Sequence, residues 1–148
     1  MEHQPSATLK RLNYLTAEIN AAYHEAALLL GLSDSAMMVL YTICDSGGRC
    51  QLGEILRLTG VSKQTINSAL RKLEAQGTVY LEASGGRKKT ICLTESGKAL
   101  AERTVARLIE VENDIFAAWT QEDREQYLAL TQRYLNDFKE KTRESFGG

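Results

Sequence analysis

The sequence predicts a mainly α-helical protein with one small antiparallel β-hairpin in its second half. Its 148 residues match the size of a single domain, and we expect one domain over residues 1–148. The one proline is Pro5, so no later position forces a helix to break. Aromatic residues make up only 7% of the chain, which disfavours a many-stranded sheet, and 43% hydrophobic residues is typical of a globular protein.

The first predicted helix spans residues 6–30. Its apolar residues recur at steps of three and four, as on one face of an amphipathic helix, and Gly31 then ends it. A second helix follows, with Ser33 or Asp34 as its N-cap. The turn-forming residues 45–48 stop this helix.

A short third helix and a longer fourth helix come next, separated by a tight turn. The third is predicted over residues 52–58, but Gln51 is a weak N-cap, so the residue at which this helix begins stays open. The turn at residues 59–61 contains a glycine. Ser62 then caps the fourth helix, which Gly77 closes.

The hydrophobic period changes from helical to alternating after Gly77. Residues 79–83 and 90–94 alternate apolar and polar side chains, which predicts two short strands that each bury one face. The connection at residues 84–89 contains two glycines and three basic residues. We therefore expect a β-hairpin with a flexible, positively charged tip.

The C-terminal third predicts two further long helices. Thr94 is the N-cap of one helix that continues to Ile115, and residues 120–123 resemble the capping box of a last helix. Together with residues 1–31 these helices carry more apolar surface than a core of about sixty residues can cover. We therefore expect residues 1–31 and 95–148 to form an obligate homodimer, with packing inside one chain as the alternative. The apolar stripe of the last helix consists of Tyr127, Leu130, Tyr134 and Phe138.

The charge distribution suggests a polyanionic partner for the middle of the chain. The net charge is −1, yet residues 61–98 hold seven basic residues and only three acidic ones. A solvated surface is the alternative explanation for so small an excess. The positions of the charges therefore matter more than their number.

The third and fourth helices with their short glycine-containing turn have the pattern of a helix-turn-helix. The amides of Gln64 and Asn67 each offer a donor and an acceptor to adenine, while Lys63 and Arg71 reach guanine or phosphate. We expect the helix at residues 62–76 to lie in the major groove of DNA. An ordinary exposed polar face is the alternative for this helix taken alone. The candidate DNA-binding residues on this helix are Ser62, Lys63, Gln64, Thr65, Asn67, Ser68 and Arg71.

The basic hairpin that follows strengthens this interpretation, because a helix-turn-helix followed by a two-stranded wing is a more specific pattern than either part alone. A two-stranded wing after a helix-turn-helix brings a cation to the minor groove, beside the major groove that the helix occupies. We expect residues 84–90 to do so, through Arg87, Lys88 and Lys89. A solvated hairpin whose charges only add solubility is the alternative.

These residues resemble the winged-helix core of the MarR family of bacterial transcription regulators. The resemblance runs from Leu32 to Gly97 and is carried by Gly60-Val61-Ser62-Lys63-Gln64-Thr65-Ile66-Asn67, Leu73-Glu74-Ala75-Gln76-Gly77, Arg87 and Leu93-Thr94-Glu95-Ser96-Gly97-Lys98. It implies a DNA-binding core at residues 32–94 and a homodimer on a palindromic double-stranded DNA operator. It also implies a regulator, acting as a repressor, that a small phenolic or other anionic effector often releases.

Two departures from the family pattern stand out. Gly85 and Gly86 occupy the places of an acidic residue and a first arginine in the wing, so Arg87 is its only arginine. Family members that sense organic peroxides carry a reactive cysteine on the first helix, and residues 6–30 contain none. Peroxide sensing by that route is therefore disfavoured.

Other functional classes receive little support from the sequence. The common nucleophile, phosphate-loop and metalloprotease motifs are missing, so we expect neither an enzyme nor a cofactor. Without a basic and apolar leader or a long apolar run, a cytoplasmic location is expected. The rival function is a winged helix that binds only proteins as a scaffold; steep salt dependence of DNA affinity would exclude it.

The cysteines allow three interpretations. Their odd number and spacing favour free thiols over disulfides. Burial as small apolar side chains is preferred over redox sensing, and over a metal site that would combine Cys44 and Cys50 with His24 or His3. The sequence assigns no functional role to Cys44, Cys50 or Cys92.

Overall fold

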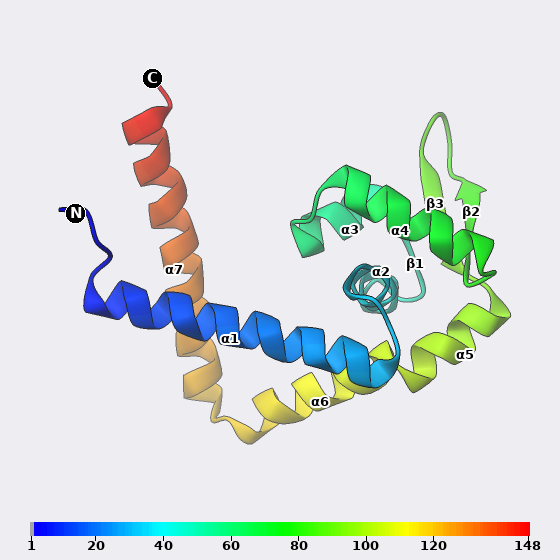
Figure 1. Ribbon diagram of the computed structural model, residues 1–148, viewed down its shortest axis with the longest axis horizontal. Helices are drawn as coiled ribbons and strands as arrows, with labels where there is room; N and C mark the ends of the chain where they lie inside the picture. Colours follow the sequence, from blue (N-terminus) through cyan, green and yellow to red (C-terminus); the bar gives the residue numbers. More distant parts are fainter. Residues whose placement is uncertain (1) are drawn as a thin grey trace. The chain divides into compact units, whose positions relative to one another are not determined.

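The computed structural model describes residues 2–148, over which the chain forms seven helices and a three-stranded sheet (Figure 1). The chain divides into two compact units, the first ending at Arg107 and the second spanning Leu108–Gly148. The helical fold with a small antiparallel sheet confirms the predicted fold class. The prediction of one domain over residues 1–148 stays a prediction.

The first two helices begin and end where their capping residues predict. Helix α1 (Ala7–Leu30) starts where the Ser6 hydroxyl accepts the N–H of Leu9, at 3.1 Å, and ends at Gly31, whose φ of +72° is left-handed. Helix α2 (Asp34–Asp45) is capped by Ser33. The alternative cap, Asp34, is the first residue of this helix.

The start of the third helix, which the sequence left open, is fixed by a side chain within the helix. Helix α3 (Leu52–Thr59) begins where the Glu54 carboxylate accepts the backbone N–H of Gln51, at 2.7 Å. Gly60 ends it with φ of +65°. Helix α4 (Lys63–Ala75) follows at once, capped by Ser62.

The sheet contains one strand more than the sequence predicts. Strands β2 (Val79–Ala83) and β3 (Lys89–Leu93) form the expected hairpin, but a third strand, β1 (Arg49–Gln51), pairs with the other side of β3. All pairings are antiparallel, in the order β1-β3-β2. Three residues are too few to show an alternating pattern from which a strand could be predicted. Strand β1 is stabilised by its backbone pairing with β3.

The core of the first unit is built around α2. This helix contacts α3, α4, α5, β1 and β3, and it lies beneath α4 in Figure 1. The side chains that meet there have no more than 2% of their surface exposed, and they bring together every element of the predicted helix-turn-helix. They include Val39, Leu40, Ile43, Ile55, Ile66, Val79 and Ile91.

The predicted single helix from Thr94 to Ile115 is two helices. Helix α5 (Glu95–Arg103) and helix α6 (Val105–Ala118) are separated by Thr104, whose φ of −123° and ψ of −93° are not helical. The buried Thr104 hydroxyl donates to the carbonyl of Leu100, at 2.6 Å. The apolar periodicity continues across Thr104, so the sequence pattern did not indicate this break.

In the second unit, the end of α6 and helix α7 (Gln121–Phe146) meet at a corner. Thr120 caps α7 as predicted, accepting the N–H of Asp123 at 3.1 Å. The Arg124 guanidinium donates to the carbonyls of Phe116 and Trp119 at 2.7 and 2.8 Å, which closes the corner. Among residues 2–148 no single helix is long and apolar enough to cross a membrane; α1 and α2 pass that test only as a pair, bent by 89°.

Candidate nucleic-acid interface

Helix α4 buries one face against α2 and leaves its polar face exposed. Ile66, Ala69, Leu70 and Leu73 form the buried face, each with at most 8% of its surface exposed. The predicted DNA-binding residues of α4 lie outside this buried stripe, and all except the half-buried Asn67 are exposed. The geometry therefore leaves these polar side chains accessible to a ligand as large as a duplex.

The first turn of α4 is held by two paired hydroxyls. The Ser62 hydroxyl accepts the N–H of Thr65 at 3.2 Å and donates to the Thr65 hydroxyl at 2.9 Å. Ser62 thus serves as the helix cap. Lys63 is the first residue of the helix and is exposed.

The two amides proposed to read bases line different grooves. Gln64 borders a groove of about 620 Å³ between α4, the start of α2 and α5. Asn67 borders a groove of about 500 Å³ beneath the wing, where Arg87 also lies. The exposed face of α4 therefore has two flanks, one toward α2 and one toward the wing.

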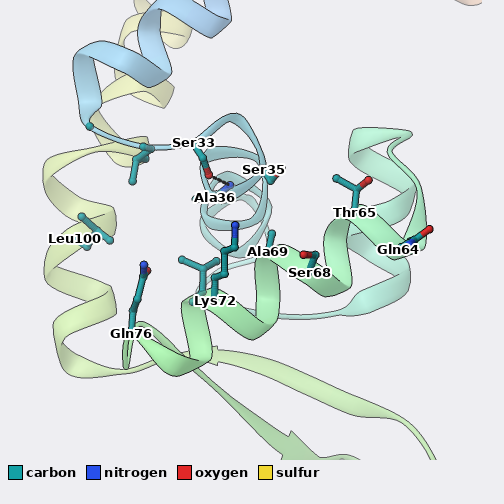
Figure 2. A pocket seen from close by; sticks show the side chains of 13 residues that line it. Ser33, Ser35, Ala36, Gln64, Thr65, Ser68, Ala69, Lys72, Gln76 and Leu100 are labelled. Atoms are coloured by element: carbon teal, nitrogen blue, oxygen red, sulfur yellow. Dashed lines mark hydrogen bonds between the residues drawn. The ribbon is translucent and has the colours of Figure 1, made fainter.

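The groove on the α2 side also contains polar residues that were not among the DNA-binding residues predicted from the sequence. Figure 2 shows Gln64, Ser68, Lys72 and Gln76 in order along α4. Ser35 of α2 lines the groove from the other side. Lys72 and Gln76 continue the four-residue spacing that starts at Gln64, so this spacing is the signal that could have identified them.

The wing groove joins the hairpin to α4. Arg87, Lys88 and Lys89 line it together with Asn67, over an apolar floor that includes Leu70. A third, smaller groove places Arg71 beside Asn67. Within residues 2–148 none of the three wing cations forms an ion pair, so their charge is available to a polyanion.

Two glycines shape the tip of the wing. Gly85 and Gly86 have φ of +99° and +59°, a region that residues with a Cβ rarely adopt. The N–H of Ser84 donates to the carbonyl of Lys88, at 3.1 Å, and closes the loop. The substitutions relative to the family's wing pattern thus produce a tight turn that carries one arginine.

The three cysteines are free thiols, and Cys50 and Cys92 are buried. Burial raises the pKa of the Cys50 thiol to about 12, and the nearby Glu54 and Cys92 add to the increase. Burial also raises the pKa of Cys44. These thiols are therefore protonated at neutral pH, which opposes a redox-sensing role.

Among residues 2–148 no group of three histidine, cysteine or acidic side chains is arranged to hold a metal ion. His24, one of the residues weighed above as a metal ligand, forms a hydrogen bond with Asp34 in which Nδ1 and Oδ2 are 2.8 Å apart. This pair connects α1 to the start of α2. The geometry gives His24 a structural contact in place of a metal.

Comparison with known proteins places the chain in a family. A family model described as MarR family matches residues 30–89. An HTH-type transcriptional repressor from Mycobacterium tuberculosis is 30% identical over 132 residues, which cover 85% of this chain and 94% of the relative. The chain belongs to the MarR family. It is a DNA-binding transcription regulator, and the MarR family consists of regulators that are not enzymes.

Solved structures of MarR proteins share this fold. A MarR family regulator from Neisseria meningitidis superposes with a TM-score of 0.77 at 24% identity, covering 93% of this chain and 97% of that one. The Staphylococcus aureus MepR–DNA complex superposes with a TM-score of 0.65 at 20% identity, covering 92% and 99%. At these identities the likeness concerns the fold alone.

Proposed function

We propose that this MarR protein is a cytoplasmic repressor that binds a palindromic operator as a two-fold homodimer. The helix at residues 62–76 lies in the major groove, and the wing at residues 84–90 lies at the minor groove. The observation that carries the proposal is the shared groove in which Asn67 of α4 and Arg87 of the wing lie. One duplex laid across this surface would meet a base-reading amide and a cation together.

The reading function is assigned to Gln64 and Asn67. Within residues 2–148 neither amide hydrogen-bonds to another residue, so both remain available to base edges. An amide presents a donor and an acceptor at the spacing of the adenine edge in the major groove. Lys63 and Arg71 are assigned to guanine or phosphate. The hydroxyls of Ser62 and Thr65 are assigned to phosphate oxygens.

Two relatives support DNA binding and repression. The Mycobacterium tuberculosis relative is described as a transcriptional repressor, and MepR was solved in complex with DNA. The two comparisons cover 85% and 92% of this chain. We therefore extend repression and duplex binding to this chain as a proposal.

The homodimer is supported by apolar helix faces that each unit leaves exposed. In the first unit, Leu12, Leu15 and Ile19 of α1 are between 39% and 50% exposed. In the second unit, α7 buries no residue and exposes Tyr134 and Phe138 at 56% each. Faces of this kind are covered by a partner in stable proteins. A two-fold dimer would place half-sites about 10 bp apart, or a multiple of that.

An anionic effector is assigned to the groove between α2 and α4. Gln64, Ser68 and Lys72 line this groove of about 620 Å³ and also belong to the polar side of α4. A small anion held there would occupy side chains that DNA needs. This overlap would convert ligand binding into release of the operator.

Selection of duplexes from a random library, followed by fluorescence anisotropy over a range of salt, tests the proposal. A selected duplex should bind more tightly than its scrambled version, and log affinity should fall steeply with log salt. Arg87→Ala should reduce the slope by about one if it neutralises one phosphate. Arg103→Ala on α5, the matched cation loss, should leave the slope unchanged. Equal affinity for selected and scrambled duplexes would instead support the protein-binding scaffold.

A further inference from the structure

An ion pair on the outer face of the sheet joins its two edge strands. Nη2 of Arg49 on β1 lies 2.7 Å from Oε2 of Glu82 on β2. In the register of the central strand, Arg49 stands opposite Cys92 and Glu82 opposite Thr90. The pair therefore crosses β3 diagonally and holds β1 and β2 together over it.

The Glu82 carboxylate also has a hydrogen-bond partner on the central strand, β3. Cys92 of β3 is only 3% exposed, and its thiol donates to the same oxygen, Oε2, at 3.6 Å. Glu82 thus has partners on both other strands. Since α3 begins at Leu52, directly after β1, Arg49 connects Glu82 to the helix-turn-helix through a few residues of backbone.

The pair lies where the wing leaves the sheet. Strand β1 makes its last pairing at Gln51 with Thr90, whereas β2 and β3 remain paired as far as Ala83 with Lys89. Beyond Thr90, toward the tip of the wing, the only strand pairing is between β2 and β3. Glu82 stands opposite Thr90, at the base of this projecting part, and its contact with Arg49 restrains β2 from β1, with which β2 has no backbone pairing.

We propose that the Arg49–Glu82 ion pair positions the wing, so that Arg87 meets the minor groove at a fixed angle. This inference rests on the proposed function of the wing. An ion pair as exposed as this one, with 60% and 52% of the two side chains accessible, contributes little to global stability. Its loss should therefore change DNA binding and leave folding intact.

The proposal is tested by whether Glu82→Gln strengthens or weakens DNA binding. Removal of a negative charge from a DNA-binding unit should by itself strengthen binding to phosphates. Loss of positioning should instead weaken binding to a selected duplex about threefold to tenfold. This loss corresponds to the lower part of the range of interaction energies between residues in contact. Thermal unfolding should stay unchanged. The matched control is Glu95→Gln, which removes the same charge from α5, where the ion pair to Lys98 stays within one helix.

A double-mutant cycle with Arg87→Ala separates this inference from the proposed function. The loss of affinity caused by Arg87→Ala should be smaller in the Glu82→Gln background than in the wild type, because the wing is already misplaced. If Glu82→Gln bound the duplex as tightly as the wild type or more tightly, the positioning role of the ion pair would be overturned. The same would follow if Arg87→Ala reduced affinity equally in both backgrounds. Either result would leave the proposed function of the wing intact. No effect of Arg87→Ala in the wild type would overturn the wing assignment and this inference with it.

Discussion

Gly97 of α5 lies against the backbone carbonyl of Thr78, so closely that a Cβ at this position would overlap the carbonyl oxygen. The same oxygen accepts the N–H of Thr94, at 3.1 Å. The start of α5 is therefore packed on the backbone that leads into the wing. This contact is the physical reason for the glycine in the Leu93–Lys98 motif.

Gly97→Ala should destabilise the protein, because neither the helix nor the Thr78 backbone can move without disturbing the sheet. We expect the free energy of unfolding to fall by about 1–3 kcal/mol, the range for overpacked sites. Urea unfolding followed by circular dichroism would measure it. Gly53→Ala is the control: Gly53 lies in α3 with nothing within 4 Å of an added Cβ, so this change should stabilise slightly or have no effect. Equal effects of the two substitutions would contradict the packing explanation.

Gln64→Ala and Asn67→Ala should reduce discrimination between DNA sequences. Each loss of a bidentate amide contact should cost about 1–3 kcal/mol of preference for the correct base. Affinity for scrambled duplex should change little, since phosphate contacts dominate nonspecific binding. Anisotropy titrations with selected and scrambled duplexes would give both values. Variants that both keep the wild-type ratio of specific to nonspecific affinity would show that α4 does not read the bases.

Tyr134→Glu should convert the proposed homodimer to a monomer at micromolar concentration, because the substitution places a charge in the apolar stripe that we propose packs against the partner. Light scattering with size-exclusion chromatography would report the mass. Asn136→Glu is the control, since Asn136 is two residues along α7 and projects from the other side of the helix. A wild-type protein that is monomeric and still binds its operator would exclude the obligate dimer.

Cys50 should make stability fall at alkaline pH. Its pKa is raised from 9.0 to about 12, so between these values the folded protein retains a proton that the unfolded chain releases. The stabilisation is fully present below pH 9 and is lost as pH rises toward 12. Urea unfolding at about pH 8 and about pH 10 should show a smaller loss for Cys50→Ala than for the wild type. Equal losses would mean that this thiol does not contribute.

The sequence alone determines the local features of this protein. Ser6, Ser33, Ser62 and Thr120 cap helices within three residues of themselves, and amphipathic periodicity defines the faces that those helices bury. The hairpin of β2 and β3 is also local. These interactions join residues close in the chain, so their patterns can be read without knowing the fold.

Tertiary structure decides the features that depend on distant residues. Strand β1 is three residues long and exists because it pairs with β3, some forty residues later. Arg49 and Glu82 are 33 positions apart, and no spacing rule joins them. Gln64 and Asn67 line different grooves only because α2 packs on one side of α4 and the wing lies on the other. Such contacts form when the buried apolar faces pack together. The local sequence does not specify which distant residue each exposed side chain will contact.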